Sequence, residues 1–175
     1  EFRYVQNITD VGHLNDDVNV ENEADKILAQ ARIEKKDPFE IARFYEKTFH
    51  DDVKALNITP ADAYPRASES IALIVDLIAQ LIYIGSAYQG SDGAIYFAAR
   101  SVKDYGAISN NSLDQLRAGY RFDATEVLEQ GKRFHADWAL WKNAGARTEM
   151  IWDSPWGKGF PGWHIECSAM SLHFL

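Results

Sequence analysis

Residues 154–170 have the sequence SPWGKGFPGWHIECSAM, which packs more unusual residues together than any other stretch of the chain. Three glycines and two prolines make this run rich in turns. Trp163, His164, Glu166 and Cys167, the only cysteine of the chain, follow within five positions. Such a density of aromatic and reactive side chains favours a functional site. The alternative is a packed loop that enters a core segment, in which the tryptophan fills space and the cysteine is a small buried side chain.

This run closely resembles the signature of cysteinyl-tRNA synthetases, which are class I aminoacyl-tRNA synthetases, and of their paralogues that ligate cysteine to an amino sugar in mycothiol synthesis. Two further stretches resemble the same family. Residues 4–11, YVQNITDV, are similar to the strand that follows its nucleotide-binding element, and residues 137–142, DWALWK, are similar to its DFxLWK motif, with Trp138 in place of Phe. All three occur in the family's order, so the resemblance spans nearly the whole chain.

The length and composition indicate a globular protein. A chain of 175 residues fits one domain, or one domain with a smaller insertion. Its 46% hydrophobic and 25% charged residues exclude a disordered chain. No run approaches the roughly 18 apolar residues of a membrane span, so no membrane is expected as a partner. A single cysteine forms no internal disulfide, and we expect a reducing, cytoplasmic location.

The formal net charge of -8 bears on any interaction with RNA. Folded RNA is bound largely through Lys and Arg contacts to phosphate, so this stretch is not expected to be the main RNA-docking surface. The resemblance implies that much of the tRNA is held by C-terminal domains outside this sequence. The acidic balance therefore weakens an RNA-binding module more than it weakens a fragment of an enzyme.

The first residues predict a strand over residues 2–8, which is rich in β-formers. Because the chain starts inside this strand, we expect a piece of a longer protein. Asn7, Thr9 and Asp10 come at the carboxyl end of the strand, where open α/β sheets place ligand-binding groups. The alternative role for these side chains is turn and cap chemistry for the next helix.

Helices are predicted next. Apolar residues between 24 and 31 repeat at helical spacing. Asp37 and Pro38 are typical of a helix start, and that helix is expected to end near Asn57. Its apolar face comprises Ile41, Phe44, Tyr45, Phe49, Val53 and Leu56. After a proline-containing linker, an apolar stripe predicts a core helix over residues 68–84.

The texture changes at Gly85, where we place a boundary. Residues 87–97 predict a hairpin, and the resemblance implies that residues 85–150 form a small mixed α+β connective insertion. The alternation of Arg133, His135 and Asp137 suggests a His–carboxylate pair, and it fits one edge strand with solvated polar residues just as well. The predicted fold is α/β, in which residues 1–84 and 151–175 belong to a Rossmann-like parallel sheet of a class I synthetase catalytic domain.

The resemblance implies the site residues. Cys167 corresponds to a zinc ligand, and the remaining ligands would lie outside this sequence. Zn²⁺ binds a thiolate far better than a neutral hydroxyl, which would separate cysteine from serine. Trp163 resembles the wall of the cysteine pocket, and a core tryptophan is the alternative. Thr9 resembles a threonine near the amino and carboxylate groups of the substrate, and His164 and Asn7 are further candidates for the cysteine pocket.

The implied function is that of a cysteine–tRNA ligase, which uses ATP to activate cysteine and transfers it to tRNA-Cys. Both of the family's ATP motifs lie outside this sequence, so the chain alone is expected to be inactive and to bind neither ATP nor zinc specifically. The mycothiol-pathway ligase and a non-catalytic binding module are the alternatives. A metal-dependent hydrolase is a weaker one, because no His-x-x-x-His or paired-cysteine spacing occurs.

Overall fold

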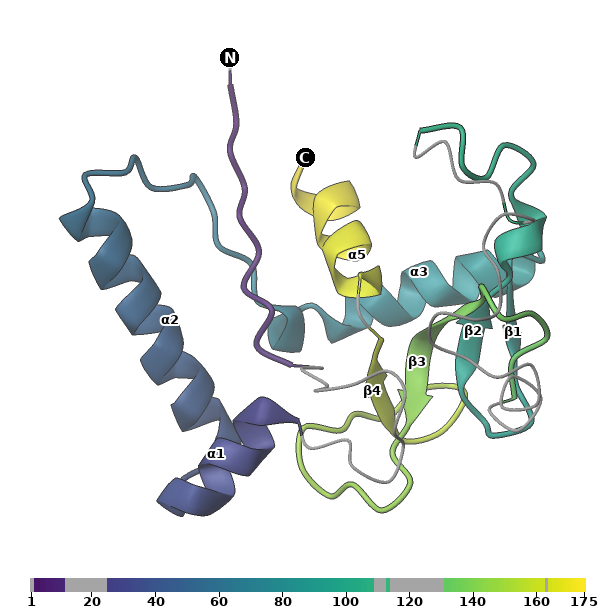
Figure 1. Cartoon of the computed structure of the whole chain (residues 1–175), viewed down its shortest axis with the longest axis horizontal. Helices are drawn as coiled ribbons and strands as arrows, with labels where there is room; N and C mark the ends of the chain where they lie inside the picture. The colour runs from purple at the N-terminus through teal and green to yellow at the C-terminus, as the bar shows by residue number, and fades with distance from the viewer. Residues whose placement is uncertain (1, 12–24, 109–112, 114–130, 163) are drawn as a thin grey trace.

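A computed structural model of the chain describes residues 2–11, 25–108, 113, 131–162 and 164–175, and Figure 1 shows how its elements are arranged. The helices are α1 (Lys26–Glu34), α2 (Pro38–Ala55), α3 (Ile71–Tyr83) and α5 (Ile165–Phe174), with 3-10 turns η2 (Ala67–Glu69) and η3 (Ala99–Ser101). The strands are β1 (Ala87–Gln89), β2 (Ile95–Phe97), β3 (Trp138–Asn143) and β4 (Gly159–Pro161). This mixture confirms the predicted α/β content.

The predicted helices form close to their expected bounds, for the local reasons that the sequence suggests. The side chain of Asp37 accepts a hydrogen bond from Phe39 N at 2.8 Å and caps α2. At the other end of the helical region, Gly85 follows α3 with a φ of +78°. A glycine adopts this left-handed conformation at little cost, so it stops the helix.

The sheet differs from the predicted Rossmann-like parallel sheet. Its order is β1-β2-β3-β4, and every neighbouring pair is antiparallel. The hairpin predicted over residues 87–97 is present as β1 and β2, joined by a turn in which Gly93 has a φ of +82°. Short turns of this kind connect antiparallel strands, whereas parallel neighbours need a crossover. The expectation of a parallel sheet through residues 151–175 is therefore wrong for the described strands.

Parallel pairing does occur at the N-terminus, but only as isolated bridges. Val5 pairs with Ala63, and Ile8 pairs with Arg66. The helices α1 and α2 lie in the sequence between residues 5–8 and residues 63–66. The connection between these two paired segments is therefore a βαβ-like crossover. Pro65 stands between the bridging positions and has no N–H, so the ladder lacks one donor and remains short.

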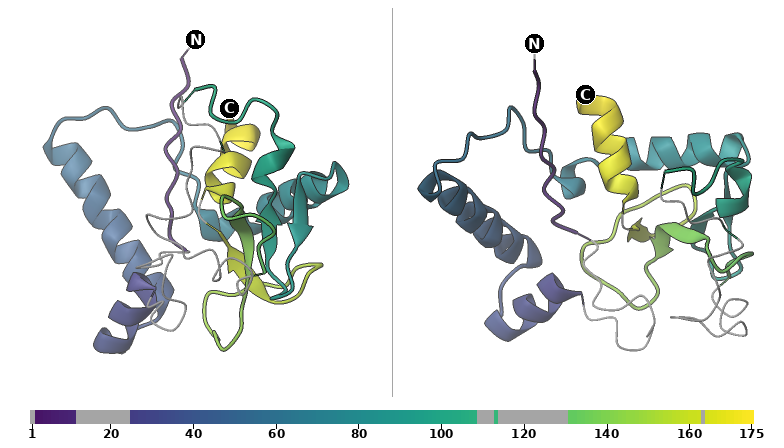
Figure 2. Two further views of the ribbon diagram at one scale, coloured as in Figure 1. Left: turned by 45° about the vertical axis from the view of Figure 1, so that its right-hand side comes forward. Right: turned by 45° about the horizontal axis from the view of Figure 1, so that its top comes forward.

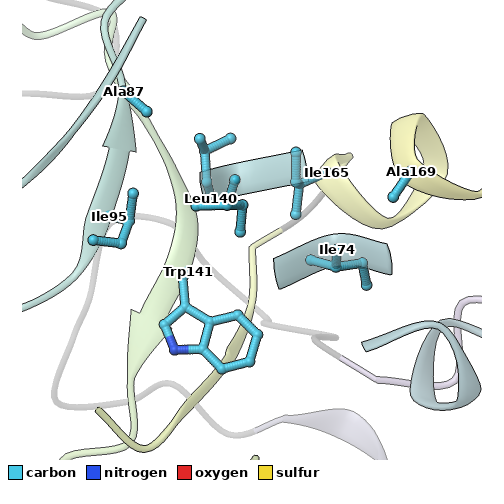
Figure 3. Packing of buried hydrophobic residues seen from close by; sticks show 8 residues of the cluster. Ile74, Ala87, Ile95, Leu140, Trp141, Ile165 and Ala169 are labelled. Atoms are coloured by element: carbon cyan, nitrogen blue, oxygen red, sulfur yellow. The ribbon is translucent and has the colours of Figure 1, made fainter. Parts of the chain in front are cut away.

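The main core lies between the sheet and the helices α3 and α5. Its buried members are Ile74, Ile78, Ala87, Ile95, Leu140, Trp141, Ile165 and Ala169, seven of which Figure 3 labels. These residues come from all three sequence segments that the boundary near Gly85 would separate. The division into residues 1–84, 85–150 and 151–175 remains a prediction about the family's architecture, while the packing joins the segments into one core.

The pair α1 and α2 lies on the opposite side of the N-terminal segment from the sheet (Figure 1). The predicted apolar face of α2 is covered only in part: Ile41 is buried, whereas Phe44 is 63% and Leu56 is 72% exposed. No helix within the described part of the chain has the length and apolar character that crossing a membrane requires.

Of the two interpretations of Asp137, that of a solvated residue of an edge strand is wrong, because its side chain is buried. Its carboxylate accepts hydrogen bonds from Tyr88 Oη at 2.5 Å, from Ala99 N at 2.8 Å and from Phe134 N at 3.1 Å. Three donors satisfy a carboxylate that would otherwise be costly to bury. Asp137 therefore ties β1, η3 and the approach to β3 together.

Candidate functional site

Residues 154–170, called the signature run below, contain β4, a tight turn and the start of α5. Gly162 N donates to Leu140 O at 2.9 Å, and a Cβ at Gly162 would collide with the carbonyl of Ala139. Only glycine allows so close an approach of two backbones. His164 then takes a left-handed conformation, with a φ of 83°, immediately before α5. The turn chemistry of the run thus fixes where α5 begins relative to β3.

The start of α5 meets the N-terminal segment through side chains of three predicted site residues. Asn7 Nδ2 donates to Thr9 Oγ1 at 3.0 Å and to Cys167 Sγ at 3.6 Å. Asn7 and Cys167 are 160 positions apart in the sequence. Figure 2 shows the N-terminal segment running beside α5 in both views. The structure therefore brings Asn7, Thr9 and Cys167 into one hydrogen-bonded cluster.

The other two predicted site residues stand differently. Trp163 lies outside the described residues. His164 is exposed, and its backbone carbonyl accepts hydrogen bonds from Ser168 N at 3.0 Å and from Ser168 Oγ at 3.1 Å. These two hydrogen bonds lie in the first turn of α5, next to the cluster of Asn7, Thr9 and Cys167.

The surroundings of Cys167 favour the neutral thiol in this chain. Burial raises the pKa of Cys167, and the negative charge of Glu166 raises it further. The hydrogen bond from Asn7 acts in the opposite direction, because it stabilises the thiolate. The side chain remains only partly buried, so its sulfur is not sealed inside the core.

Glu166 is a residue of the signature run for which the sequence alone suggested no role. Its side chain is 2% exposed, and Oε2 has no hydrogen-bond partner among the described residues. Burial raises the pKa of Glu166, while backbone N–H groups at the start of α5 lower it less. Its position inside the motif, close to His164 and Cys167, is the one sequence signal that could have drawn attention to it.

Asp10 anchors the carboxyl end of the N-terminal segment. Its carboxylate accepts from Ser68 N at 2.9 Å and from Ser68 Oγ at 2.6 Å, and it pairs with Arg43 of α2 at 3.1 Å. Arg43 and Arg66 also pair with Glu46. Asp25, and not Asp10, caps α1, while the contacts of Asp10 with Ser68 and α2 fix the backbone that carries Asn7 and Thr9.

A cavity of about 550 Å³ opens beside this segment, between it and the helices α1 and α2. Its lining comprises Gln6, Asn7, Ile8, Thr9, Asp10, Lys26, Ile27, Gln30, Ile41, Ala42, Tyr45, Glu46 and Phe49. Asn7 thus lines the cavity and also contacts Cys167, while Thr9 lines the cavity and accepts a hydrogen bond from Asn7. A cavity that is mostly apolar, with a few convergent polar groups, has the character of a small-molecule site.

Phe160 occupies a position where the resemblance leads us to expect arginine. The ring is buried, and the guanidinium of Arg147 lies 4.3 Å from its centroid. Arg147 Nη2 also pairs with Asp25 Oδ2 at 2.9 Å, and Asp25 caps α1. The guanidinium of Arg147 therefore places a positive charge next to residue 160, and it links β4 to the start of α1.

The residues present do not fit a complete zinc site. Zinc sites in proteins are built from three or four Cys, His, Asp or Glu side chains. Across the described part of the chain, no group of three such residues is arranged to hold a metal ion. Cys167 could supply one sulfur ligand, and its partial exposure leaves the sulfur reachable.

A comparison of sequences identifies the family of the chain. The family profile described as "tRNA synthetases class I (C) catalytic domain" matches residues 1–175, which is the whole chain. The chain belongs to this family. The predicted resemblance is thereby confirmed, and with it the assignment of the chain to the catalytic domain of a class I aminoacyl-tRNA synthetase.

The curated relatives agree with the family. The cysteine–tRNA ligase of Thermus thermophilus is 45% identical over 175 residues, which are 100% of this chain and 35% of the relative. That of Deinococcus radiodurans is 47% identical over 175 residues, or 34% of its length. That of Thermococcus kodakarensis is 48% identical over 151 residues, or 86% of this chain and 30% of the relative. The chain spans about a third of the length of these relatives.

Proposed function

We propose that the chain is part of the catalytic domain of a cysteine–tRNA ligase and contributes to the recognition of cysteine. The observation that carries the proposal is the meeting of Asn7, Thr9 and Cys167, which come from two family motifs 160 positions apart. The name shared by the relatives, cysteine–tRNA ligase, supports the choice of cysteine as the amino acid and tRNA-Cys as the acceptor.

The hydrogen bonds within the cluster determine which of its atoms remain available to donate or accept. A side-chain amide carries two N–H donors and one acceptor oxygen. The amide nitrogen of Asn7 donates one hydrogen bond to Thr9 and one to Cys167. Asn7 Oδ1 remains as an acceptor. Thr9 Oγ1 accepts from Asn7, which leaves its O–H as a donor. An acceptor beside a donor suits the ammonium and carboxylate groups of an amino acid.

Trp163, His164 and Cys167 complete the proposed pocket from the side of α5. Trp163 would form an apolar wall beside the substrate, as the resemblance implies. In the whole protein Cys167 would be one of several zinc ligands, and zinc would supply preferential binding of a thiolate over a hydroxyl group. The other ligands would lie outside this sequence, so we propose that the chain alone does not hold zinc specifically.

The proposed reaction is a group transfer in two steps. A carboxylate oxygen of cysteine attacks the α-phosphorus of ATP, the bond to the β-phosphate breaks, and pyrophosphate leaves. A hydroxyl group of the terminal adenosine of tRNA-Cys then attacks the acyl carbon, and AMP leaves. Positioning and charge stabilisation are the main tasks of the protein. Both ATP motifs lie outside the chain, so we propose that it is inactive alone and works in a cytoplasmic, ATP-containing setting.

Cysteine-dependent exchange between ATP and labelled pyrophosphate tests the function. The full-length protein that carries this chain is expected to catalyse the exchange with cysteine, whereas the 175-residue chain is not. Exchange that is absent from the full-length protein would contradict the proposed ligase. Cysteine transfer to an amino sugar instead of tRNA-Cys would favour the mycothiol-pathway ligase.

A further inference from the structure

An exposed tryptophan stands at one end of the sheet. Trp138 is the first residue of β3 and is 36% exposed. Its ring stacks on that of Phe97 on β2, with 4.5 Å between the ring centroids and 23° between the planes. No other ring of the described residues contacts Trp138. The stacked pair of Phe97 and Trp138, called the aromatic platform below, therefore offers part of a flat apolar surface to a partner.

The aromatic platform lies next to the signature run. Gly162 N donates to Leu140 O at 2.9 Å, and a Cβ at Gly162 would collide with the carbonyl of Ala139, the residue that follows Trp138. The helix α5 starts three residues after Gly162, where Figure 1 shows β4 ending beside β3. The aromatic platform therefore adjoins the turn that leads from β4 to the candidate pocket.

A positively charged side chain is fixed close to the start of β3. Arg100 of η3 is exposed, and its guanidinium lies 4.0 Å from the centroid of the Phe134 ring. Ala99 N and Phe134 N both donate to the buried carboxylate of Asp137, the residue before Trp138. An arginine stacked on a ring keeps its N–H groups at the edge of the guanidinium plane, where a phosphate can accept them.

The distribution of charge distinguishes this region from the rest of the chain. Residues 85–150 contain eight Lys or Arg and eight Asp or Glu residues, so the formal net charge of -8 arises outside them. One of these acids, Asp137, is buried and accepts three hydrogen bonds. The acidic balance that argues against RNA binding by the chain as a whole therefore does not apply to the surface around the aromatic platform.

We propose that the aromatic platform binds the single-stranded end of an RNA, with one base stacked on Trp138 and a neighbouring phosphate paired with Arg100. This inference rests on the proposed function, whose acceptor is a tRNA. Single-stranded RNA is recognised largely by the stacking of unpaired bases on aromatic side chains and by Arg or Lys contacts to phosphate. A base stacked beside the turn before α5 directs the end of the RNA toward the candidate pocket.

Two partial reactions separate this role from a structural one. Cysteine-dependent pyrophosphate exchange needs cysteine and ATP, whereas the transfer of cysteine needs tRNA-Cys as well. A change that only loosens the sheet affects both reactions, and so does the loss of a stacking surface for the adenine base of ATP. A change to an RNA-binding platform raises the KM for tRNA-Cys and leaves the exchange unaltered.

The test compares Trp138→Leu with Trp138→Phe in the full-length protein, with a transcript of tRNA-Cys as the probe. The loss of one stacked base in Trp138→Leu should raise the KM for tRNA-Cys at least about fivefold, while the rate of exchange stays within about twofold. Trp138→Phe keeps an aromatic ring that can stack on Phe97, so its KM for tRNA-Cys should stay within about threefold of the unsubstituted value.

Arg100→Gln tests the phosphate contact. It should raise the KM for tRNA-Cys and lower the slope of log KM against log salt concentration by about 0.7, the value for one phosphate of a single strand. Arg100→Lys keeps the charge and should keep most of this slope. Phe44→Leu is the control at an aromatic side chain of α2 that is 63% exposed, and it should change neither the exchange nor the KM for tRNA-Cys.

The outcomes separate this inference from the proposed function. Equal losses of exchange and transfer in Trp138→Leu, or an unchanged KM for tRNA-Cys in both Trp138→Leu and Arg100→Gln, would overturn the role of the aromatic platform. If Trp138→Leu does not fold, the salt dependence of Arg100→Gln decides. Exchange without any transfer to tRNA-Cys in the unsubstituted protein would also overturn that role. Absence of cysteine-dependent exchange would instead overturn the proposed function.

Discussion

The two sides of the molecule are stabilised by different forces. The sheet, α3 and α5 enclose an apolar core in which Ile74, Ile78 and Ile95 have no exposed surface. The helix α2 is instead tied by ion pairs, from Arg43 to Asp10 of the N-terminal segment and from Glu46 to Arg66, and it leaves large apolar side chains exposed. Apolar burial therefore holds the sheet side together, whereas ion pairs contribute more to the α1–α2 side.

The largest effect is expected in the apolar core. Ile78→Ala should lower the free energy of unfolding by about 2–5 kcal/mol, because it removes a fully buried side chain and leaves a cavity. Tyr83→Ala on the same helix is the matched control, since Tyr83 is 92% exposed. Chemical denaturation measures both. Equal losses for the two variants would contradict a core on this side.

A smaller loss is expected where a buried carboxylate organises the sheet. Asp137→Asn replaces one acceptor oxygen by an N–H₂ group that faces donors from Tyr88, Ala99 and Phe134. A buried donor left unsatisfied should cost about 1–3 kcal/mol in the free energy of unfolding. The exposed Asp104, changed to Asn, provides the control. A stability of Asp137→Asn equal to that of the control would show that the network contributes nothing.

The pH dependence should differ in sign between the two sides. Burial alone would raise the pKa of Glu46, but hydrogen bonds and charges from Arg66 and Arg43 lower it below its ordinary value of 4.5. Its stabilising contribution is therefore present above pH 4.5 and is lost as the pH falls through the lower, folded-state pKa. Glu46→Gln should remove part of the loss of stability on acidification, as followed by unfolding titrations between acid and neutral pH.

Glu166 should behave in the opposite way, because burial raises its pKa above 4.5. Its contribution is present below pH 4.5 and is lost as the pH rises through the higher, folded-state pKa. Glu166→Gln should consequently stabilise the chain at neutral pH and have little effect at acid pH. A loss of stability at neutral pH would show that the ionised carboxylate has a partner there.

The smallest effect is expected on the exposed face of α2. Phe44 is 63% exposed, so Phe44→Ser should change the free energy of unfolding by no more than about 0.5 kcal/mol. Thermal unfolding at matched protein concentration measures this. A loss comparable to that of Ile78→Ala would mean that the face is covered by another part of the protein or by a second copy.

The sequence predicted features that depend on local chemistry. The cap by Asp37, the stop at Gly85 and the hairpin of β1 and β2 are confirmed, since each depends on neighbouring residues. The direction of the sheet could not be predicted in this way, because strand pairing depends on contacts between distant segments. The burial of Asp137 could not be predicted for the same reason, since one of its donors is Tyr88, 49 positions away.

The same distinction between local sequence signals and contacts between distant segments applies to the candidate site. The family motifs selected Asn7, Thr9 and Cys167 from the sequence, whereas the bond from Asn7 to Cys167 required the fold to bring α5 against the N-terminal segment. Glu166 received no role, because nothing local showed that its carboxyl group would be buried without a partner among the described residues.

The central claim is that Cys167 takes part in the recognition of cysteine, and its most direct test is pyrophosphate exchange by the full-length protein with and without Cys167→Ser. The change replaces only the sulfur atom and should leave the packing of α5 intact. The account predicts that cysteine-dependent exchange falls to background while the unfolding temperature is retained. Undiminished exchange in Cys167→Ser would contradict it.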